Sequence, residues 1–465
     1  MADKSIILDY SCCLAEIIGG NGLNREQVDR LEKEMVAVHE KLAQMRADDI
    51  LGFWNLPWQD GLETAKINNL VSKWRDKIDN LVVLGIGGSA LGTTAVDMAL
   101  HGVWRLALPA TGQRPLKIWV ADNSDPRNFY SLLNRLDQDR TLYNVVSKSG
   151  STAETMSQFL IVSERLNKKL GREKAQSRII FTTDPQEGAL RYLAEREGYA
   201  ALDLPSNVGG RYSVLSSVGL FPLAMAGHDI NALLEGARAM AERCAVPEFA
   251  KNPAYIFAAM AISAWRAQRN VLVMMPYVSD LFGLAQWFVQ LWAESLGKRF
   301  NLAGEDVFVG QTAVAATGAT DQHSQLQLFM EGPQDKLLCF LSLDNYGRDL
   351  EIPCLYDDMP AFSYLGGRSM SELIQSEARA TASALALEGR PSLSIRLPSI
   401  TEHILGQLLF MLQAATVAAG AMLNINPLDQ PGVELSKKLT YGLMGRSGYE
   451  EFKAKLLKQA TPYIV

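Results

Sequence analysis

The sequence VVSKSGSTAET, residues 145–155, joins the end of a predicted β-strand to the start of a predicted helix. A helix start presents unpaired backbone N–H groups and the positive end of the helix dipole. The hydroxyls of Ser147, Ser149 and Thr152 add hydrogen-bond donors, and Lys148 adds a positive charge. The turn therefore predicts a binding site for a phosphate monoester. The alternative is an ordinary Ser/Thr cap on a strand–helix turn.

The turn belongs to a series of alternating strands and helices. Continuous apolar runs are typical of strands buried on both faces, and they occur at residues 81–86, 117–122, 142–147, 178–183 and 199–204. A second series follows a helical stretch, with strands expected at 270–277, 336–343 and 392–397. This alternation predicts parallel α/β sheets, and the similar layout of the two halves predicts two domains of one type.

We divide the chain into four parts on this basis. Residues 1–60 are expected to form a helical N-terminal segment, with residues 51–60 (LGFWNLPWQD) as its connecting loop. Residues 61–228 form a first α/β domain that carries the phosphate turn, and residues 229–424 form a second one. Residues 425–465 form a C-terminal helical segment that carries Lys437.

Composition restricts the class of protein. The chain has 465 residues, 48% apolar and 21% charged, which is enough for two or three globular domains. Its formal net charge of −6 is not concentrated in runs, so neither a nucleic acid nor a membrane surface is the expected partner. Five scattered cysteines without metal-ligand spacing predict no metal site and no disulfide framework, and they favour a cytoplasmic location. The N-terminus shows no signal-peptide pattern.

The uncharged segment 404–423 is long enough to span a bilayer. It contains Gln407, Gln413 and Thr416, and no second segment of this kind accompanies it. We therefore expect a helix buried in the protein, with a membrane span as the less favoured alternative.

A glycine-rich loop, GIGGSALG at residues 85–92, follows the first predicted strand of the first domain. It departs from the dinucleotide pattern G-x-G-x-x-G, so a dinucleotide is the less favoured ligand and no cofactor is predicted. Glycines allow the backbone to approach a small anion closely. Because ligands bind beyond the carboxyl ends of parallel strands, we expect Gly88 and Ser89 to face the same crevice as the phosphate turn.

Two further segments carry charges suited to catalysis. In NVGGRYS, residues 207–213, two glycines precede Arg211, which could neutralise an anion or a developing oxyanion; the alternative is a surface arginine. In the predicted helix 280–298, Gln290 and Glu294 share one face with apolar neighbours. Glu294 is thus a candidate general base, and a solvated helix glutamate is the alternative.

His323 and Lys437 complete the candidate residues. His323 lies in the loop GATDQHSQ and is the only one of five histidines with small and polar residues on both sides, which suits a general acid or base. Lys437 stands near the start of a predicted helix, where a cation opposes the helix dipole and suggests a functional partner.

These motifs resemble those of the glucose-6-phosphate isomerase family in its shorter form, and they occur in the family's order. The blocks are GIGGSALG (85–92), SKSGSTAET (147–155), GGRYSVLSSVG (209–219), ESLGK (294–298), DQHSQ (321–325) and DQPGVELSKK (429–438). The resemblance implies two sugar-isomerase (SIS) type domains, each a five-stranded parallel α/β sandwich, with helical N- and C-terminal segments. It implies a small phosphosugar as substrate and neither metal nor cofactor.

The resemblance also implies a role for each candidate. Ser147, Lys148, Ser149 and Thr152 would hold the phosphate, with Gly88 and Ser89 nearby. Glu294 matches the base that moves a proton between C2 and C1, and Arg211 matches the group that stabilises the cis-enediolate. His323, assisted by Lys437, matches the ring-opening residue. Gln290 and Gln430 would line the sugar.

In this family the histidine comes from the neighbouring subunit, so the resemblance implies a homodimer. The chain departs from the family pattern at Leu428, where Phe or Tyr is preferred, and at Ser436, where Gly is common. Two other functions stay open. One is an isomerase that also accepts mannose 6-phosphate. The other is a non-catalytic phosphosugar-binding regulator, which would need the Ser/Thr turn but neither Glu294, Arg211, His323 nor Lys437.

Overall fold

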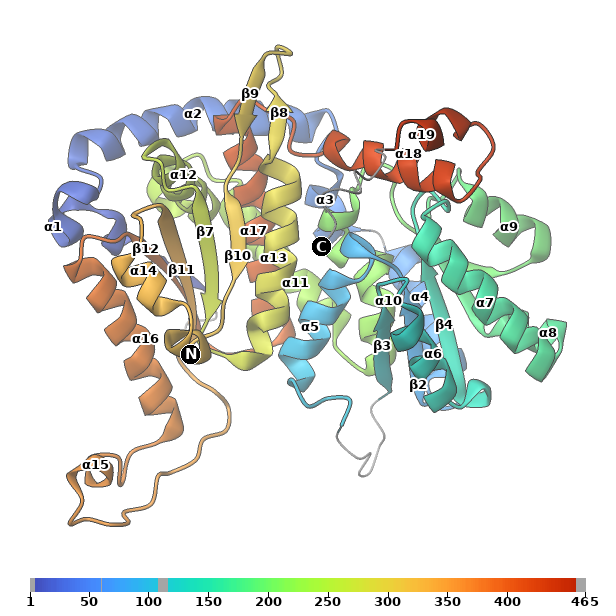
Figure 1. Ribbon diagram of the computed structural model, residues 1–465, viewed down its shortest axis with the longest axis horizontal. Helices are drawn as coiled ribbons and strands as arrows, with labels where there is room; N and C mark the ends of the chain where they lie inside the picture. The colour runs from blue at the N-terminus through green and yellow to red at the C-terminus, as the bar shows by residue number, and fades with distance from the viewer. Residues whose placement is uncertain (1–4, 60, 108–115, 457–465) are drawn as a thin grey trace, which may run out of the picture.

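The computed structural model describes residues 5–59, 61–107 and 116–456. Two five-stranded β-sheets stand side by side, each covered by helices, and a long central helix runs between them (Figure 1). This arrangement confirms the α/β class with two sheet domains, of which the first is parallel throughout and the second is parallel except for one edge strand. The boundaries proposed at residues 60, 228 and 424 stay predictions.

The first sheet has the strand order β3-β2-β4-β5-β6, and every neighbouring pair is parallel. Its strands are β2 (Asn80–Leu84), β3 (Lys117–Ala121), β4 (Thr141–Val146), β5 (Ile179–Thr183) and β6 (Ala200–Asp203). All six positions of the central strand β4 are buried, because helices cover both faces of the sheet. The five strands expected in this half are confirmed, with ends shifted by one or two residues.

The second sheet has the order β1-β12-β11-β7-β10. Its parallel strands are β7 (Val271–Pro276), β10 (Thr312–Ala315), β11 (Lys336–Leu343) and β12 (Ser392–Leu397). Strand β1 (Ile7–Asp9) pairs antiparallel with β12, so the N-terminal segment is not only helical but also supplies an edge strand. Strands β1 and β10 were not expected, because runs of three or four residues are too short to show a period.

The long uncharged segment forms helix α17 (Glu402–Met422). Its length and composition suit a bilayer, but 94% of its most apolar window is buried inside the protein. It packs against α2 (Arg25–Ala47), α11 (Ile230–Cys244), α12 (Pro253–Arg266) and α13 (Phe282–Leu296). The expectation of a buried core helix is confirmed for this segment.

Residues 51–60 differ from the expected loop. Residues 52–58 form the short helix α3 (Gly52–Asn55) and a 3-10 turn (Leu56–Trp58). Phe53 is buried and stacks on Tyr212, with 4.9 Å between the ring centroids. Phe53 and Trp54 therefore fold into the core, whereas Trp58 stays exposed, and burial of apolar area outweighs the loop preference of the Gly and Pro residues.

Three outlying elements complete the fold. A hairpin of β8 (Lys298–Phe300) and β9 (Asp306–Val309) follows α13. Helices α18 (Glu434–Leu443) and α19 (Glu450–Ala454) lie over the end of the first domain (Figure 1). An arm, residues 345–369, leaves the second sheet after β11, carries the single-turn helix α15 (Pro360–Ser363) and returns to α16 (Met370–Leu387).

Candidate active site

The phosphate turn connects β4 to helix α7 (Ala153–Leu170). The Ser147 Oγ and the Thr152 Oγ1 are 3.0 Å apart, and the Ser149 Oγ lies 3.0 Å from the Ser151 Oγ. Thr152, at the N-cap of α7, makes no side-chain cap hydrogen bond, so the helix start is not closed by its own hydroxyl. This geometry favours an anion site over the simple capping turn.

Gly150 allows the turn to fold tightly. Its φ is +62°, and a Cβ there would lie 2.5 Å from the backbone nitrogen of Leu190. No larger residue fits this position without moving the backbone. The turn is therefore held rigidly against the start of helix α9 (Ala189–Glu197).

Lys148 takes a different orientation from the one expected. Its Nζ donates hydrogen bonds to the backbone carbonyls of Ser206 and Val208, the latter at 3.2 Å. Burial lowers the pKa of this ammonium. An ammonium has three donors, so Lys148 fastens the turn to the loop that leads to Arg211 and keeps one donor for an anion.

The glycine loop meets the Arg211 loop directly. A Cβ on Gly88 would lie 2.1 Å from the carbonyl carbon of Gly210 and 2.4 Å from the nitrogen of Arg211. Only a glycine permits this contact of two backbones. Ser89 ends the same 3-10 turn (Gly87–Ser89), so both loops that follow β2 and β4 stand at the carboxyl end of the first sheet.

Arg211 is 2% exposed and fully engaged. Its guanidinium donates to the Ser295 Oγ (2.7 Å), the Gln430 Oε1 (2.8 Å), the Glu294 Oε2 (3.3 Å) and the carbonyls of Pro427 (2.7 Å) and Asp429 (2.9 Å). A planar fork with five donors suits this shell, and a lysine could not reproduce it. The side chain is therefore a fixed cation and not the surface arginine of the alternative.

Glu294 lies in the last turn of α13, one helical turn after Gln290. Its side chain is 29% exposed and forms an ion pair with Arg211. Its environment is thus neither an apolar pocket nor open solvent. The Oε1 of Gln290 is buried and has no hydrogen-bond partner among the described residues. A carboxylate, a guanidinium and an unsatisfied amide oxygen therefore lie on one helix face and its partner loop.

Lys298 is a site residue to which the sequence analysis assigned no role. It is 7% exposed, and its Nζ donates to the carbonyls of Glu294 (2.8 Å), Ser295 (2.9 Å) and Asp429 (3.0 Å). Burial, aided by the charge of Arg211, lowers its pKa to about 8. A cation at the carboxyl end of a helix is stabilised by the helix dipole. The Gly-Lys pair that ends the block ESLGK was the signal for it.

His323 is not brought to Glu294 within this chain. His323 ends the 3-10 turn Thr320–His323 beyond β10, where the neighbouring Gln322 donates to the hydroxyl of Tyr277, just after β7. Glu294 lies at the amino end of the second sheet, because α13 runs antiparallel to β7. Gly297, the first residue after α13, packs against Gly310, which precedes β10. The 15 residues of α13 span about 22 Å.

Lys437 also stays apart from the carboxylate. Its side chain is 49% exposed and pairs with Glu434 of the same helix at 2.9 Å. Helix α18 nevertheless reaches the phosphate turn, because the hydroxyl of Tyr441 donates to the carbonyl of Ser151 at 3.3 Å. Gln430, just before this helix, does reach Arg211.

Within the described ranges, one group of side chains has the composition of a metal site, formed by Asp97, His101 and His228. The Asp97 carboxylate already accepts from Arg105 at 2.5 Å and from His101 at 2.9 Å. A guanidinium on the same carboxylate repels a metal cation. The group therefore serves as a buried polar link between α5 (Leu91–His101) and the start of α11.

Comparison with known proteins agrees with this geometry. A family model described as phosphoglucose isomerase matches residues 62–447. The chain belongs to the phosphoglucose isomerase family. Among its curated relatives, glucose-6-phosphate isomerase of Carboxydothermus hydrogenoformans is 43% identical over 97% of each chain. That of Rubrobacter xylanophilus is 42% identical over 97% of this chain and 100% of its own.

Two solved structures share the fold of this chain. A hypothetical protein from Thermus thermophilus is 36% identical, with a TM-score of 0.82 over 95% of this chain and 100% of its own. A glucose-6-phosphate isomerase from Chlamydia trachomatis has a TM-score of 0.81 at 21% identity, over 97% of this chain and 91% of its own. The resemblance noted from the motifs is therefore confirmed for both family and fold.

Proposed function

We propose that the chain interconverts glucose 6-phosphate and fructose 6-phosphate, with Glu294 as the base and Arg211 as the stabiliser of the enediolate. The observation that carries this proposal is the ion pair at 3.3 Å between a partly exposed carboxylate and a buried guanidinium, beside the glycine loop. A regulator that only binds a phosphosugar needs the Ser/Thr turn and gains nothing from this pair. An isomerase needs both.

The substrate phosphate would bind at the start of α7. Ser147, Ser149 and Thr152 offer hydroxyl donors there, Lys148 offers its remaining N–H, and the backbone of Gly88 and Ser89 borders the same edge of the sheet. Because the donors of the phosphate turn are fixed, the turn would orient the sugar without contacting the reacting carbons.

Proton transfer would then occur between the two domains. Glu294 takes the proton from C2 of the open-chain aldose and returns it to C1, which converts the aldehyde into a ketone through a cis-enediolate. A well-placed general base contributes about 10²–10⁴-fold in rate. Five hydrogen bonds already occupy the N–H groups of Arg211 and fix its guanidinium, so Arg211 stabilises the developing oxyanion through its positive charge.

The sugar hydroxyls would require hydrogen-bond partners beside Glu294 and Arg211. Gln290 has a buried Oε1 without a partner in the described part of the chain, and it lies against the glycine loop. A buried amide oxygen without a hydrogen bond is costly, and a sugar hydroxyl would satisfy it. Gln430 is the second candidate for contact with the sugar, because its Oε1 accepts from Arg211 at 2.8 Å beside Glu294.

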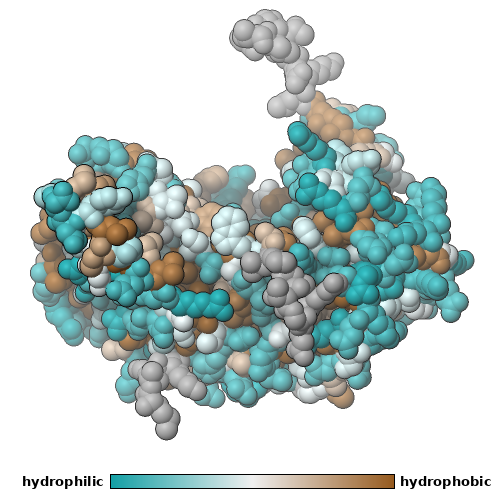
Figure 2. Space-filling view, turned by 90° about the horizontal axis from the view of Figure 1, so that it is seen from below, coloured by the Kyte–Doolittle hydropathy of each residue, from teal (hydrophilic) through white to brown (hydrophobic). Residues whose placement is uncertain are grey.

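Ring opening is assigned to His323 of a second copy of the chain, with Lys437 assisting, in a homodimer. His323 is exposed and lies at the opposite end of the second sheet from Glu294, so one chain cannot bring the two together. The arm 345–369 offers a surface for the second copy: Leu350 is 72% and Tyr356 is 67% exposed. Figure 2 shows apolar residues among hydrophilic ones on the side of the molecule where Figure 1 draws this arm. Large apolar side chains that are exposed together on one segment favour an interface.

Subunit mixing tests the shared site. We expect Glu294→Gln and His323→Ala each to lose activity as pure proteins. In a mixed dimer of the two, one site carries both substitutions and the other carries neither. Random exchange makes half of the dimers mixed, so roughly a quarter of wild-type activity returns. If mixing restores nothing although exchange is shown by differently tagged chains, His323 acts within its own chain or not at all.

The reaction is tested by proton NMR with fructose 6-phosphate in heavy water. Glucose 6-phosphate that carries deuterium at C2 establishes base-mediated exchange. Mannose 6-phosphate beside it supports the broader isomerase. An unchanged spectrum with bound ligand supports the regulator. We further propose a cytoplasmic location, which the five unpaired cysteines support because a reducing compartment keeps such thiols free.

A further inference from the structure

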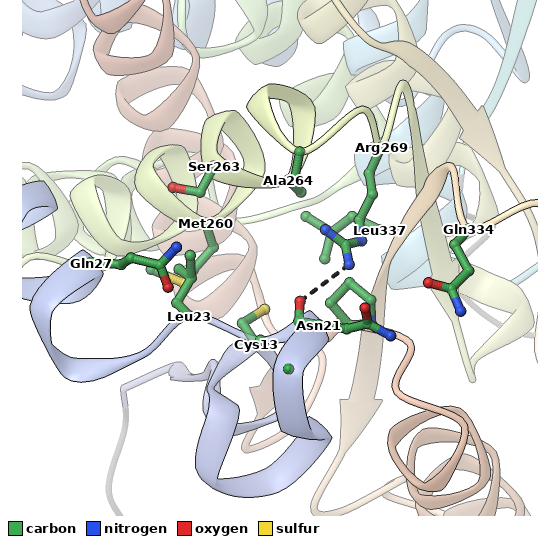
Figure 3. Close-up of a pocket in the computed structure, with 14 residues that line it drawn as sticks. Cys13, Asn21, Leu23, Gln27, Met260, Ser263, Ala264, Arg269, Gln334 and Leu337 are labelled. Carbon is green, nitrogen blue, oxygen red and sulfur yellow. Dashed lines mark hydrogen bonds between the residues drawn. The ribbon is translucent and has the colours of Figure 1, made fainter.

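A cavity of about 440 Å³ lies apart from the active-site residues, between the N-terminal segment and the second sheet (Figure 3). Its walls come from the turns around residues 20–23, the end of α12 and the start of β11. None of the residues discussed above as catalytic or phosphate-binding lines it. This volume lies within the range of small-molecule sites.

One charged side chain, Arg269, projects into this cavity and is 8% exposed (Figure 3). Its Nη2 donates to the carbonyl of Asn21 at 3.1 Å, and its Nε has no hydrogen-bond partner in the described part of the chain. No carboxylate of the described residues lies within ion-pair distance of it. Burial lowers its pKa.

A buried guanidinium without a counter-ion is expensive, because its desolvation is not offset by an opposite charge. The structural bond to Asn21 uses only one of the five N–H donors of the guanidinium, and Gln311 separately holds the backbone here by donating to the carbonyl of Arg269 at 2.9 Å. An anion in the cavity would supply this counter-charge and accept from the free Nε.

The remaining walls indicate what kind of anion fits. Leu23, Met260 and Leu337 are apolar, whereas Asn21, Ser263 and Gln334 bring amide and hydroxyl groups (Figure 3). One guanidinium supplies a single positive charge in a planar fork that matches a carboxylate. A phosphate dianion would leave excess negative charge among apolar walls.

We propose that this cavity binds a small organic carboxylate, with Arg269 as the counter-ion of the carboxylate and the apolar walls around a compact body. Such a ligand contacts both the N-terminal segment and the second sheet. It therefore fastens the segment to the domain and raises the unfolding temperature of the whole protein.

The test is a titration of the full chain with 4-fluorobenzoate, followed by ¹⁹F NMR, with fructose 6-phosphate present at saturating concentration. We expect saturable binding to the wild type and at least about tenfold weaker binding to Arg269→Gln. The matched control is Arg266→Gln, which removes an arginine one turn away that pairs with Glu34 outside the cavity. It should bind as the wild type does, and both variants should keep isomerase activity.

A second variant keeps the test decisive if Arg269→Gln does not fold. Ala267→Phe narrows the cavity and leaves Arg269 in place, and we expect it to weaken binding at least about tenfold. Absence of saturation with the wild type overturns the proposal. So does equal affinity of the wild type and both cavity variants, or binding of the probe that appears only when fructose 6-phosphate is left out.

Discussion

The two sheets have five strands each and similar βα connections, yet they contribute to the site from opposite ends. The first sheet presents Ser147 and Gly88 at the carboxyl ends of β4 and β2. The second presents Glu294 at the end of a helix, level with the start of β10. On the assignment proposed above, the rule that ligands bind at carboxyl ends would hold for the phosphate and fail for the catalytic carboxylate. His323 stands at the carboxyl end of the second sheet, and in the proposed homodimer it would serve the site of the second copy.

The two regions also differ in the kind of interaction they supply. The first offers several hydroxyl donors and one N–H of Lys148, each of which adds a little binding energy. The second offers a buried cation and a carboxylate held by one hydrogen-bond network. We therefore expect substitutions in the second region to lower kcat and those in the first to raise KM.

The sharpest test of this difference is Glu294→Gln. We expect kcat to fall by about 10²–10⁴-fold with little change in KM, because the amide cannot accept the C2 proton. Exchange of that proton with heavy water, followed by NMR, should stop as well. Glu388→Gln, at an exposed position after α16, is the control. Undiminished exchange in Glu294→Gln would assign the base elsewhere.

Arg211→Lys should have the next largest effect. The lysine keeps the charge but cannot donate to all five partners of the guanidinium. We expect kcat/KM to fall by about 10²–10³-fold and the free energy of unfolding to fall by about 2–4 kcal/mol. Kinetics and urea denaturation measure the two effects. A variant with normal kcat/KM but lowered stability would limit Arg211 to a structural role.

Ser147→Ala tests the first region. We expect KM for the phosphosugar to rise about tenfold with kcat unchanged, since one donor of several to a charged group is lost. Ser157→Ala is the control, because the Ser157 hydroxyl bonds a carbonyl on the exposed side of α7. A fall in kcat instead of a rise in KM would contradict the division between binding and chemistry.

The smallest effect concerns Lys298, whose pKa is about 8 in the folded protein against an ordinary value of 10.5. Between these values the unfolded chain holds a proton that the folded chain has released. A rise in pH therefore stabilises the fold, by at most about 1.4 kcal/mol per pH unit, and below pH 8 this dependence vanishes. Denaturation of the wild type and Lys298→Met from about pH 7 to 10 measures it. If the free energy of unfolding changes with pH equally in the wild type and in Lys298→Met, the lowered pKa of Lys298 is wrong.

The sequence predicted the buried strands well, because runs such as residues 142–147 have no polar interruption and tertiary packing does not override them. It predicted the turn between β4 and α7 for the same local reason, and phosphate binding by this turn stays a prediction. It did not show Lys298 as a site residue, because that role depends on Asp429, 131 positions away. Nor did it show that Lys148 donates hydrogen bonds to carbonyls of the 205–208 loop, since every residue has a backbone carbonyl and the sequence does not tell which one is used.

Helix α17 has a consequence for how the protein is made. It is the core partner of α2, α11, α12 and α13, and the backbone N–H of Ile6 donates to Gln407 across 401 positions. During synthesis, the apolar faces of these earlier helices stay exposed until residues 402–422 have been made. The core around α17 therefore forms late in synthesis. Until then these helices expose apolar surface that chaperones can cover.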